Sequence, residues 1–169
     1  MITVGIVGPE STGKTTLAKG LAEHFNTLWV PEYAREFLSD LDRPYEKKDL
    51  VAIAKGQLES ERQYRKKAKD ILFLDTDLFV IKIWSEFKYG ECDPWILQQL
   101  GMNKASVYLL THFDMPYEPD PLRENPSQRP ELFDLYENAL KEAGVLYAVI
   151  QGNKHKRMDT AIQKINSII

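Results

Sequence analysis

The sequence predicts an α/β fold: an open parallel sheet of five strands with helices on both faces and an arginine-bearing lid. Short apolar runs of strand length alternate with longer segments in which apolar residues recur at helical spacing. A glycine-rich turn follows the first run, and a proline-rich stretch follows the fourth. This alternation is typical of parallel sheets, because parallel strands need long, usually helical, crossovers. The 169 residues, 43% of them hydrophobic, are expected to form one domain over residues 1–169.

Charge and cysteine content narrow the class of protein. The formal net charge of −3 gives no basic surface for nucleic acid. Cys92 is the only cysteine, which excludes an intramolecular disulfide and fits a reducing compartment. The three histidines are scattered and form no metal-binding pair. Without a signal-peptide pattern or a membrane-length apolar run, we expect a cytoplasmic protein that acts on a small molecule, without nucleic-acid or membrane partners. The sequence is also compatible with assembly of the chain into a homo-oligomer.

The turn Gly8-Pro9-Glu10-Ser11-Thr12-Gly13-Lys14-Thr15 has the spacing of a phosphate-binding loop, or Walker A motif. It lies between the apolar run 2–7 and the helical segment 14–25, which is the context that a P-loop NTPase-type fold requires. Its glycines allow N–H groups to point at a phosphate, and the helix start adds partial positive charge. Lys14 is expected to reach the β- and γ-phosphates, and Thr15 to bind Mg²⁺. The expected ATP-binding residues here are Gly8, Glu10, Ser11, Thr12, Gly13, Lys14, Thr15 and Thr16.

A second short strand over residues 27–30 leads into a helix that Pro31 is expected to open, because proline suits the first helical position. Ligands of open parallel sheets bind outside the carboxyl ends of the strands. Glu32, Tyr33 and Arg35 are therefore predicted to face a second substrate, with Glu32 as a general base. An ordinary helix start with exposed charges remains an alternative. The long helical pattern 46–69 ends in a basic run, which is interpreted as a solvated helix face rather than an anion site.

The run Ile71 to Leu74 followed by Asp75 is typical of a buried parallel strand that ends at the ligand edge. Asp75 is predicted to hold Mg²⁺ with Thr15, as the second acidic element of phosphate-loop proteins does. Glu32 and Asp75 could exchange the base and metal roles. Asp77 is predicted to contact the substrate or to cap the next helix, which runs to about Lys88. Trp84 on that helix is either core or a platform for a nucleoside.

The fourth strand, over residues 106–111, precedes an irregular segment from His112 to Pro130. A stretch of this length inside a compact domain is usually an active-site lid or a disordered loop. Arg123 and Arg129 favour a lid at about residues 113–130, because closure would bring two guanidinium groups onto the transferring phosphate. A helix over 131–142, a strand over 145–150 and a last helix follow. Asn153 and Arg157, at the turn into that helix, are predicted to contact ATP near its adenine.

These segments together resemble the nicotinamide riboside kinase domain of the NadR family. The resemblance spans nearly the whole chain and is most specific in Pro31 to Glu36 and Asp75 to Asp77, because many nucleotide-binding proteins share the first motif. The matching segments are Gly8 to Ala18, Trp29 to Glu36, Phe73 to Asp77 with Trp84 to Glu86, Tyr108 to Leu110, Leu122 to Arg129, and Gly152 and Asn153 with Arg157.

The resemblance implies phosphorylation of the 5′-hydroxyl of nicotinamide riboside to nicotinamide mononucleotide, with ATP and Mg²⁺, in NAD salvage. Bifunctional relatives add an adenylyltransferase domain. The sequence has no His-x-Gly-His-type signature, so only the kinase step is expected. A kinase for another nucleoside or small hydroxyl compound would share the architecture, and a nucleotide-dependent switch would use the 113–130 segment to bind a partner. The sequence decides neither ATP over GTP nor the regulation.

Overall fold

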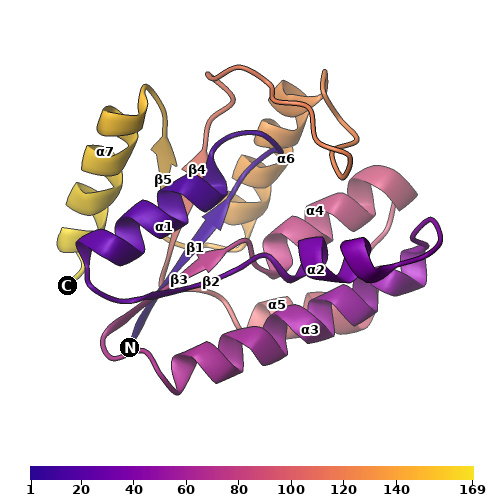
Figure 1. Cartoon of the computed structure of the whole chain (residues 1–169), viewed down its shortest axis with the longest axis horizontal. Helices are drawn as coiled ribbons and strands as arrows, with labels where there is room; N and C mark the ends of the chain where they lie inside the picture. The colour runs from indigo at the N-terminus through magenta and orange to yellow at the C-terminus, as the bar shows by residue number, and fades with distance from the viewer.

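The fold is built on five parallel strands, and the structure, a computed structural model, describes all residues 1–169. The strands are β1 (Ile2–Val7), β2 (Leu28–Val30), β3 (Ile71–Asp75), β4 (Val107–Thr111) and β5 (Tyr147–Ile150). They pair in the order β2-β3-β1-β4-β5 (Figure 1). All five carboxyl ends therefore meet at one edge, as the sequence predicted, and β1 lies in the centre with its loop between β3 and β4.

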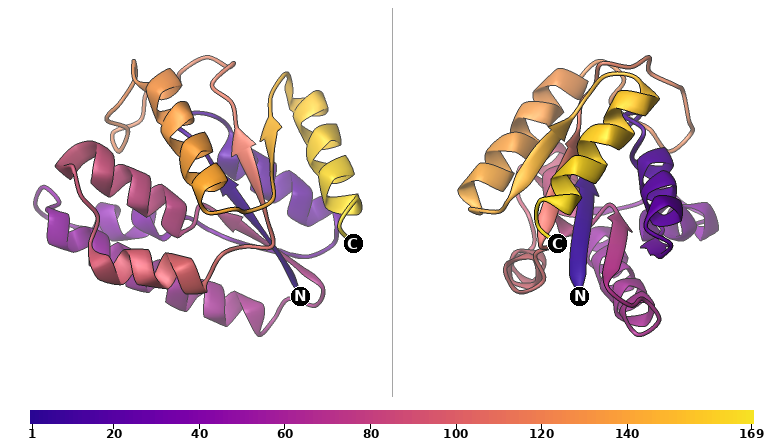
Figure 2. Two further views of the ribbon diagram at one scale, coloured as in Figure 1. Left: turned by 180° about the vertical axis from the view of Figure 1, so that it is seen from behind. Right: turned by 90° about the vertical axis from the view of Figure 1, so that its left-hand side faces the viewer.

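Helices cover both faces of the sheet because side chains alternate along each strand. They are α1 (Lys14–His24), α2 (Tyr33–Asp40), α3 (Lys47–Arg65), α4 (Leu78–Tyr89), α5 (Pro94–Met102), α6 (Arg129–Glu142) and α7 (Lys154–Asn166). On β1, Val4 and Ile6 pack with α1 and α7, whereas Leu72 and Leu74 of β3 face the larger core under α3 to α6. The right-hand view of Figure 2 places α1 and α6 on opposite sides of the strands.

Two helix boundaries differ from the sequence-based expectation. Pro31 does not open α2: Glu32 is extended, and the helix starts at Tyr33, whose N–H donates to Gln57 Oε1 at 3.0 Å. The side-chain amide of Gln57, on α3, thus fixes the start of α2. Helix α6 begins at Arg129 instead of Glu131, because Pro130 in the first turn needs no hydrogen bond from its nitrogen. Arg129 is therefore the first residue of a helix and does not belong to the irregular segment.

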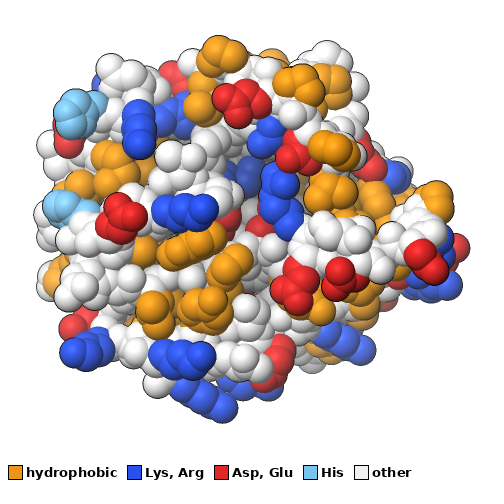
Figure 3. Space-filling view, viewed as in Figure 1, with side chains coloured by type: hydrophobic (Ala, Val, Ile, Leu, Met, Phe, Trp, Pro, Cys, Tyr) orange, Lys and Arg blue, Asp and Glu red, His pale blue; other side chains and the backbone are white.

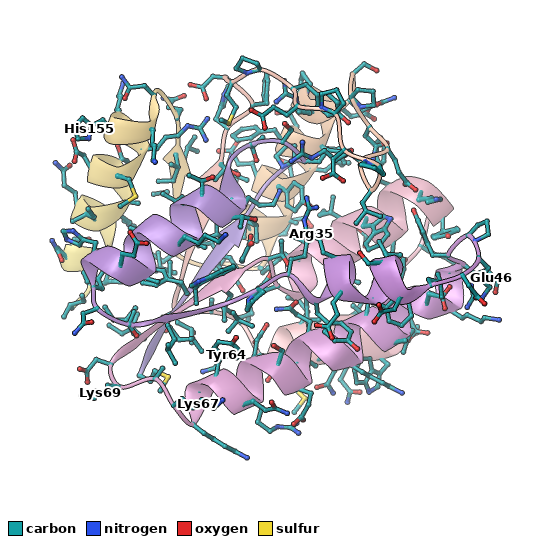
Figure 4. All side chains as sticks on the ribbon, viewed as in Figure 1. Arg35, Glu46, Tyr64, Lys67, Lys69 and His155 are labelled. Carbon is teal, nitrogen blue, oxygen red and sulfur yellow. The ribbon has the colours of Figure 1, made fainter.

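The basic run at the end of α3 and directly after it lies far from the phosphate loop. The helix ends at Arg65 rather than near residue 69, and Lys66 is its C-cap. Lys67 and Lys69 lie at the lower edge of the molecule in Figure 4, next to the amino end of β3. These cations are thus at the edge of the sheet opposite the carboxyl ends. None of the seven helices is both long and apolar enough to cross a membrane.

Candidate active site

A cavity of about 640 Å³ opens at the carboxyl edge of the sheet. Figure 3 shows a hollow near the centre of the face, with Lys and Arg side chains in its depth. The phosphate loop forms one side, the start of α2 and the apolar face of α4 form another, and the segment 115–125 with α6 closes the top. Predicted residues in the lining are Gly8, Glu10, Ser11, Thr12, Gly13, Lys14, Thr15, Thr16, Glu32, Arg35, Trp84 and Arg123.

The phosphate loop has the backbone that its glycines predict. Gly8 and Gly13 have φ values of +145° and +79°, and a Cβ on Gly8 would lie 2.5 Å from Thr111 Oγ1. Lys14 Nζ donates to the Gly8 and Pro9 carbonyls at 3.0 and 2.7 Å. Burial lowers the Lys14 pKa, while the Glu32 and Asp75 carboxylates oppose that change. The amine is thus held in the loop, among groups that favour its charged form.

Thr15 and Asp75 meet at the sheet edge. Thr15 Oγ1 donates to Asp75 Oδ2 at 2.6 Å, whereas Asp75 Oδ1 is buried without a hydrogen-bond partner. Burial raises the pKa of Asp75, and the Thr15 hydrogen bond opposes the change. No group of three His, Cys, Asp or Glu side chains is placed to hold a metal. Mg²⁺ needs only one or two protein ligands besides water and phosphate, so this hydroxyl and the unpartnered carboxylate oxygen fit it.

Glu32 and Arg35, at the start of α2, line the same cavity as the phosphate loop. Glu32 Oε2 is 3.3 Å from Arg35 Nε, and Arg35 Nη1 donates to Asp120 Oδ2 at 3.1 Å. Figure 4 shows Arg35 extending from α2 toward the segment above it. Burial raises the Glu32 pKa; Lys14 opposes this rise and Asp75 adds to it. Glu32 is therefore a carboxylate with increased basicity in the cavity that holds the phosphate loop.

The predicted substrate residues Tyr33 and Asp77 do not line the cavity. The Tyr33 ring packs on α3, where a Cβ on Gly56 would lie 2.0 Å from it. Asp77 caps α4 through a 2.8 Å bond from Phe79 N and accepts a 2.8 Å bond from the Tyr108 hydroxyl. Burial raises its pKa to about 6. The Tyr33 ring is thus committed to packing, and the alternative prediction that Asp77 caps the next helix is confirmed.

Asn153 and Arg157 also lie outside the cavity lining. Asn153 Oδ1 accepts from Lys156 N at 2.9 Å and caps α7. The buried guanidinium of Arg157 donates to the carbonyls of Thr12 at 2.7 Å and of Gly152 and His112 at 2.8 Å. Because the C=O and N–H of a peptide point in opposite directions, holding the Thr12 carbonyl turns the Gly13 N–H the other way. Arg157 thus fixes the phosphate loop from the side that faces away from the cavity.

The irregular segment 113–128 lies against the phosphate loop. Ser11 Oγ accepts from Glu118 N at 2.8 Å, and the Glu10 carboxylate accepts from Glu124 N at 3.0 Å and Asn125 N at 2.6 Å. Arg123 lines the cavity, and its guanidinium bonds the Glu118 carbonyl.

The two predicted lid arginines do not occupy equivalent positions. Arg129 does not line the cavity: its Nη1 donates to the Ser11 carbonyl at 3.0 Å, and its guanidinium carbon lies 5.5 Å from the centre of the Tyr117 ring. The structure therefore brings Arg123 to the cavity and Arg129 to the outside of the loop.

Several cavity residues have no signal in the sequence. Lys88 and Glu124 read as ordinary surface charges, yet both line the cavity. Tyr136 fits the apolar pattern of α6, and it contributes to the cavity as well as to the core. Helical spacing could have placed Lys88 one turn beyond Trp84, but nothing in the sequence indicates that Glu124 lies near either residue.

The sheet order, the loop conformation and the Thr15–Asp75 pair define a P-loop nucleoside-triphosphate-binding protein of the α/β class. A family model described as AAA domain matches residues 3–157. The chain belongs to this family.

Comparisons with individual proteins give a more specific relationship. The chain is 27% identical over 155 residues to the trifunctional NAD biosynthesis/regulator protein NadR of Escherichia coli (strain K12), covering 88% of this chain and 38% of that protein. Crystal structures of NadR with NAD and AMP-PNP and with NR align at TM-scores of 0.80 and 0.79, with 23% and 24% identity. These alignments cover 98% of this chain and 49% and 51% of those chains. The chain thus spans between 38% and 51% of the length of these relatives.

A deoxyadenosine kinase from M. mycoides shares the fold at a TM-score of 0.69 and 13% identity, over 98% of this chain and 100% of that one. The resemblance to NadR and the P-loop kinase fold expected from the sequence are therefore confirmed. Identities of 13% to 27% do not identify the acceptor substrate, whereas the cavity lining bears on it.

Proposed function

We propose that the protein is an ATP-dependent kinase that phosphorylates the 5′-hydroxyl of nicotinamide riboside to nicotinamide mononucleotide, a step of NAD biosynthesis. The observation that carries this proposal is the single cavity in which Lys14 and Thr15 share the space with Glu32 and Arg35. Such a cavity admits a nucleotide and a hydroxyl acceptor together. The NadR relative named for NAD biosynthesis, and the NadR complex with NR, support the choice of acceptor.

We assign residues 1–169 to a single kinase domain with its lid at about 113–130. The phosphate loop, from Gly8 to Thr16, would bind ATP, and Lys14 would exchange its two loop carbonyls for β- and γ-phosphate oxygens. Burial disfavours the Lys14 charge, and an anionic phosphate beside the amine would stabilise its charged form. Arg123 would contribute a second cation from the lid.

Thr15 and Asp75 would hold Mg²⁺, because their oxygen atoms are adjacent and one carboxylate oxygen has no partner. When bound, the ion would neutralise phosphate charge during transfer. This arrangement gives Asp75 the metal role and leaves Glu32 as the base.

Glu32 would accept the proton of the acceptor hydroxyl while the hydroxyl oxygen forms a bond to the γ-phosphorus. The bond from that phosphorus to the bridging oxygen would break, and ADP would leave. A raised pKa makes the Glu32 carboxylate a stronger base than an ordinary glutamate, and its 3.3 Å ion pair with Arg35 fixes its orientation. Phosphoryl transfer depends mainly on such positioning and on charge neutralisation.

The riboside would occupy the part of the cavity beyond Glu32, between α2, α4 and α6. Trp84 and Phe87 of α4 and Tyr136 of α6 supply aromatic surface there. Flat nucleoside bases bind against such surfaces. Tyr33 and Asp77 would act through the positions they give α2 and α4.

The test is ADP release from ATP and Mg²⁺ with nicotinamide riboside, purine and pyrimidine nucleosides, shikimate or no acceptor. Turnover with nicotinamide riboside alone is expected. Turnover with another acceptor would keep the kinase and discard the substrate, whereas no acceptor-dependent turnover would favour a nucleotide-dependent switch. Lys14→Ala, which removes the phosphate-binding amine, is the control and should be inactive in every arm.

A further inference from the structure

The hydroxyl of Tyr45 joins three segments at the outer end of the cavity. Tyr45 lies in the connection between α2 and α3. Its oxygen is 2.9 Å from Trp84 Nε1 and 2.5 Å from Lys88 Nζ, both on α4. It also lies 2.8 and 2.7 Å from the carboxylate oxygens of Glu124 in the 113–128 segment. A phenol has one proton and two lone pairs, so one donated and two accepted bonds use its full capacity.

Glu124 carries this contact to the phosphate loop. Its side chain accepts from Tyr45, whereas its backbone N–H donates to Glu10 Oε2 at 3.0 Å. One residue of the lid therefore touches the nucleotide side of the cavity with its backbone and the acceptor side with its carboxylate.

Tyr45 acts on the cavity without lining it. Trp84, Lys88 and Glu124 are all lining residues, while Tyr45 is not. The Tyr45 and Trp84 rings meet edge to face, with centroids 5.0 Å apart, and the indole N–H bond adds a second constraint. The indole ring thus has a fixed position on the cavity wall. Without the hydroxyl, Trp84 Nε1 and the Glu124 carboxylate would each lose a partner.

We propose that Tyr45 is a positioning residue for the acceptor: its hydroxyl holds Trp84 in place on the cavity wall and fastens the lid through Glu124. The proposal rests on the proposed kinase function, with an aromatic nucleoside as the acceptor. Its consequence is a division of effects. Loss of the hydroxyl impairs acceptor binding and lid closure, while the phosphate loop keeps its own contacts with ATP.

Tyr45→Phe removes the hydroxyl and keeps the ring. The matched control is Tyr147→Phe, because the Tyr147 hydroxyl also bonds a glutamate, Glu137, at 2.9 Å but lies outside the cavity lining. We expect Tyr45→Phe to raise the acceptor KM about tenfold, as the loss of one charge-assisted hydrogen bond would, with the ATP KM within about twofold of wild type. Equal acceptor KM values in the two variants would overturn the proposed role of Tyr45 in acceptor binding.

A second readout needs no substrate. Backbone hydrogen exchange over residues 113–128 should be faster in Tyr45→Phe and in Glu124→Gln than in wild type and Tyr147→Phe. Unchanged exchange in both cavity variants would overturn the fastening of the lid. The readout also separates the two proposals: if wild type phosphorylates no nucleoside, the kinase proposal fails, while exchange still decides whether Tyr45 holds the lid.

Discussion

Thr15 Oγ1 donates a 2.6 Å hydrogen bond to Asp75 Oδ2, joining the end of the phosphate loop to the end of β3. The two residues are 60 positions apart in the sequence, and the pairing of β1 with β3 brings them together. The second oxygen of Asp75 is buried and unpartnered. One Asp75 oxygen therefore remains available to a further ligand, which is the basis of the first prediction.

Asp75→Asn should lower kcat about 10²- to 10³-fold, because the amide keeps the size of the side chain and removes the charge that would hold Mg²⁺. The measurement is kcat as a function of Mg²⁺ concentration. Asp77→Asn is the matched control, since Asp77 caps α4 and both of its carboxylate oxygens already accept hydrogen bonds within the protein. It should lower the melting temperature and leave the Mg²⁺ dependence unchanged. The same Mg²⁺ dependence in wild type and Asp75→Asn would refute the metal role.

Glu32→Gln should lower kcat about 10²- to 10⁴-fold, the usual contribution of a general base. Burial raises the Glu32 pKa above its ordinary value of 4.5. The wild-type rate should therefore rise with pH as this carboxyl loses its proton, and the variant should lack that limb. The measurement is kcat/KM against pH at saturating ATP. An identical limb in Glu32→Gln would assign the base to another group.

Arg123 and Arg129 should behave differently, because only Arg123 lines the cavity. Arg123→Ala should lower kcat about tenfold or more and change the acceptor KM little, as expected for a cation that acts on the transferring phosphate. Arg129→Ala removes a 3.0 Å bond to the Ser11 carbonyl and should mainly raise the ATP KM. Steady-state kinetics of both variants decide the point; equal kcat losses would mean that both arginines reach the phosphate.

The buried Glu61 on α3 gives a prediction about stability. Glu61 is 3% exposed, and burial together with the Asp77 charge raises its pKa to about 8, against opposing effects from Gln57 and Arg65. Because the folded-state pKa exceeds the ordinary 4.5, the stabilisation from this group is complete below pH 4.5 and is lost as pH rises through 8. The side chain introduced by Glu61→Gln is a neutral amide, which does not ionise.

Between pH 6 and 9, Glu61→Gln should therefore lose less stability than wild type, by about 1–3 kcal/mol. Urea denaturation at the two pH values measures the difference. Parallel losses in the two proteins would show that Glu61 titrates normally.

The sheet and the phosphate loop could be predicted because their signals are local. The apolar runs give the strands, and the fixed residues from Gly8 to Thr15 specify a backbone that only certain residues adopt. The position of Asp75 follows from its place at the end of a strand. In these segments, the residues that define the structure lie next to one another in the sequence.

The side chains whose orientation depends on distant partners could not be predicted. Tyr33 turns to Gly56, Asp77 to Tyr108 and Arg157 to Thr12, and no spacing rule links these pairs. The same limit hides the contact between Tyr45 and Glu124, which are 79 residues apart. Sequence position placed the predicted residues near the correct edge of the sheet, while tertiary contacts decide which of them face the cavity.

Phosphorus NMR of a reaction with Mg²⁺, ATP and nicotinamide riboside shows whether the γ-phosphoryl group of ATP is transferred to a primary hydroxyl. A 5′-phosphate is coupled to two methylene protons, so the proposal predicts a new phosphomonoester triplet that grows with ADP and is absent with Lys14→Ala. A doublet would place the phosphate on a secondary hydroxyl. Inorganic phosphate alone would contradict the proposed kinase.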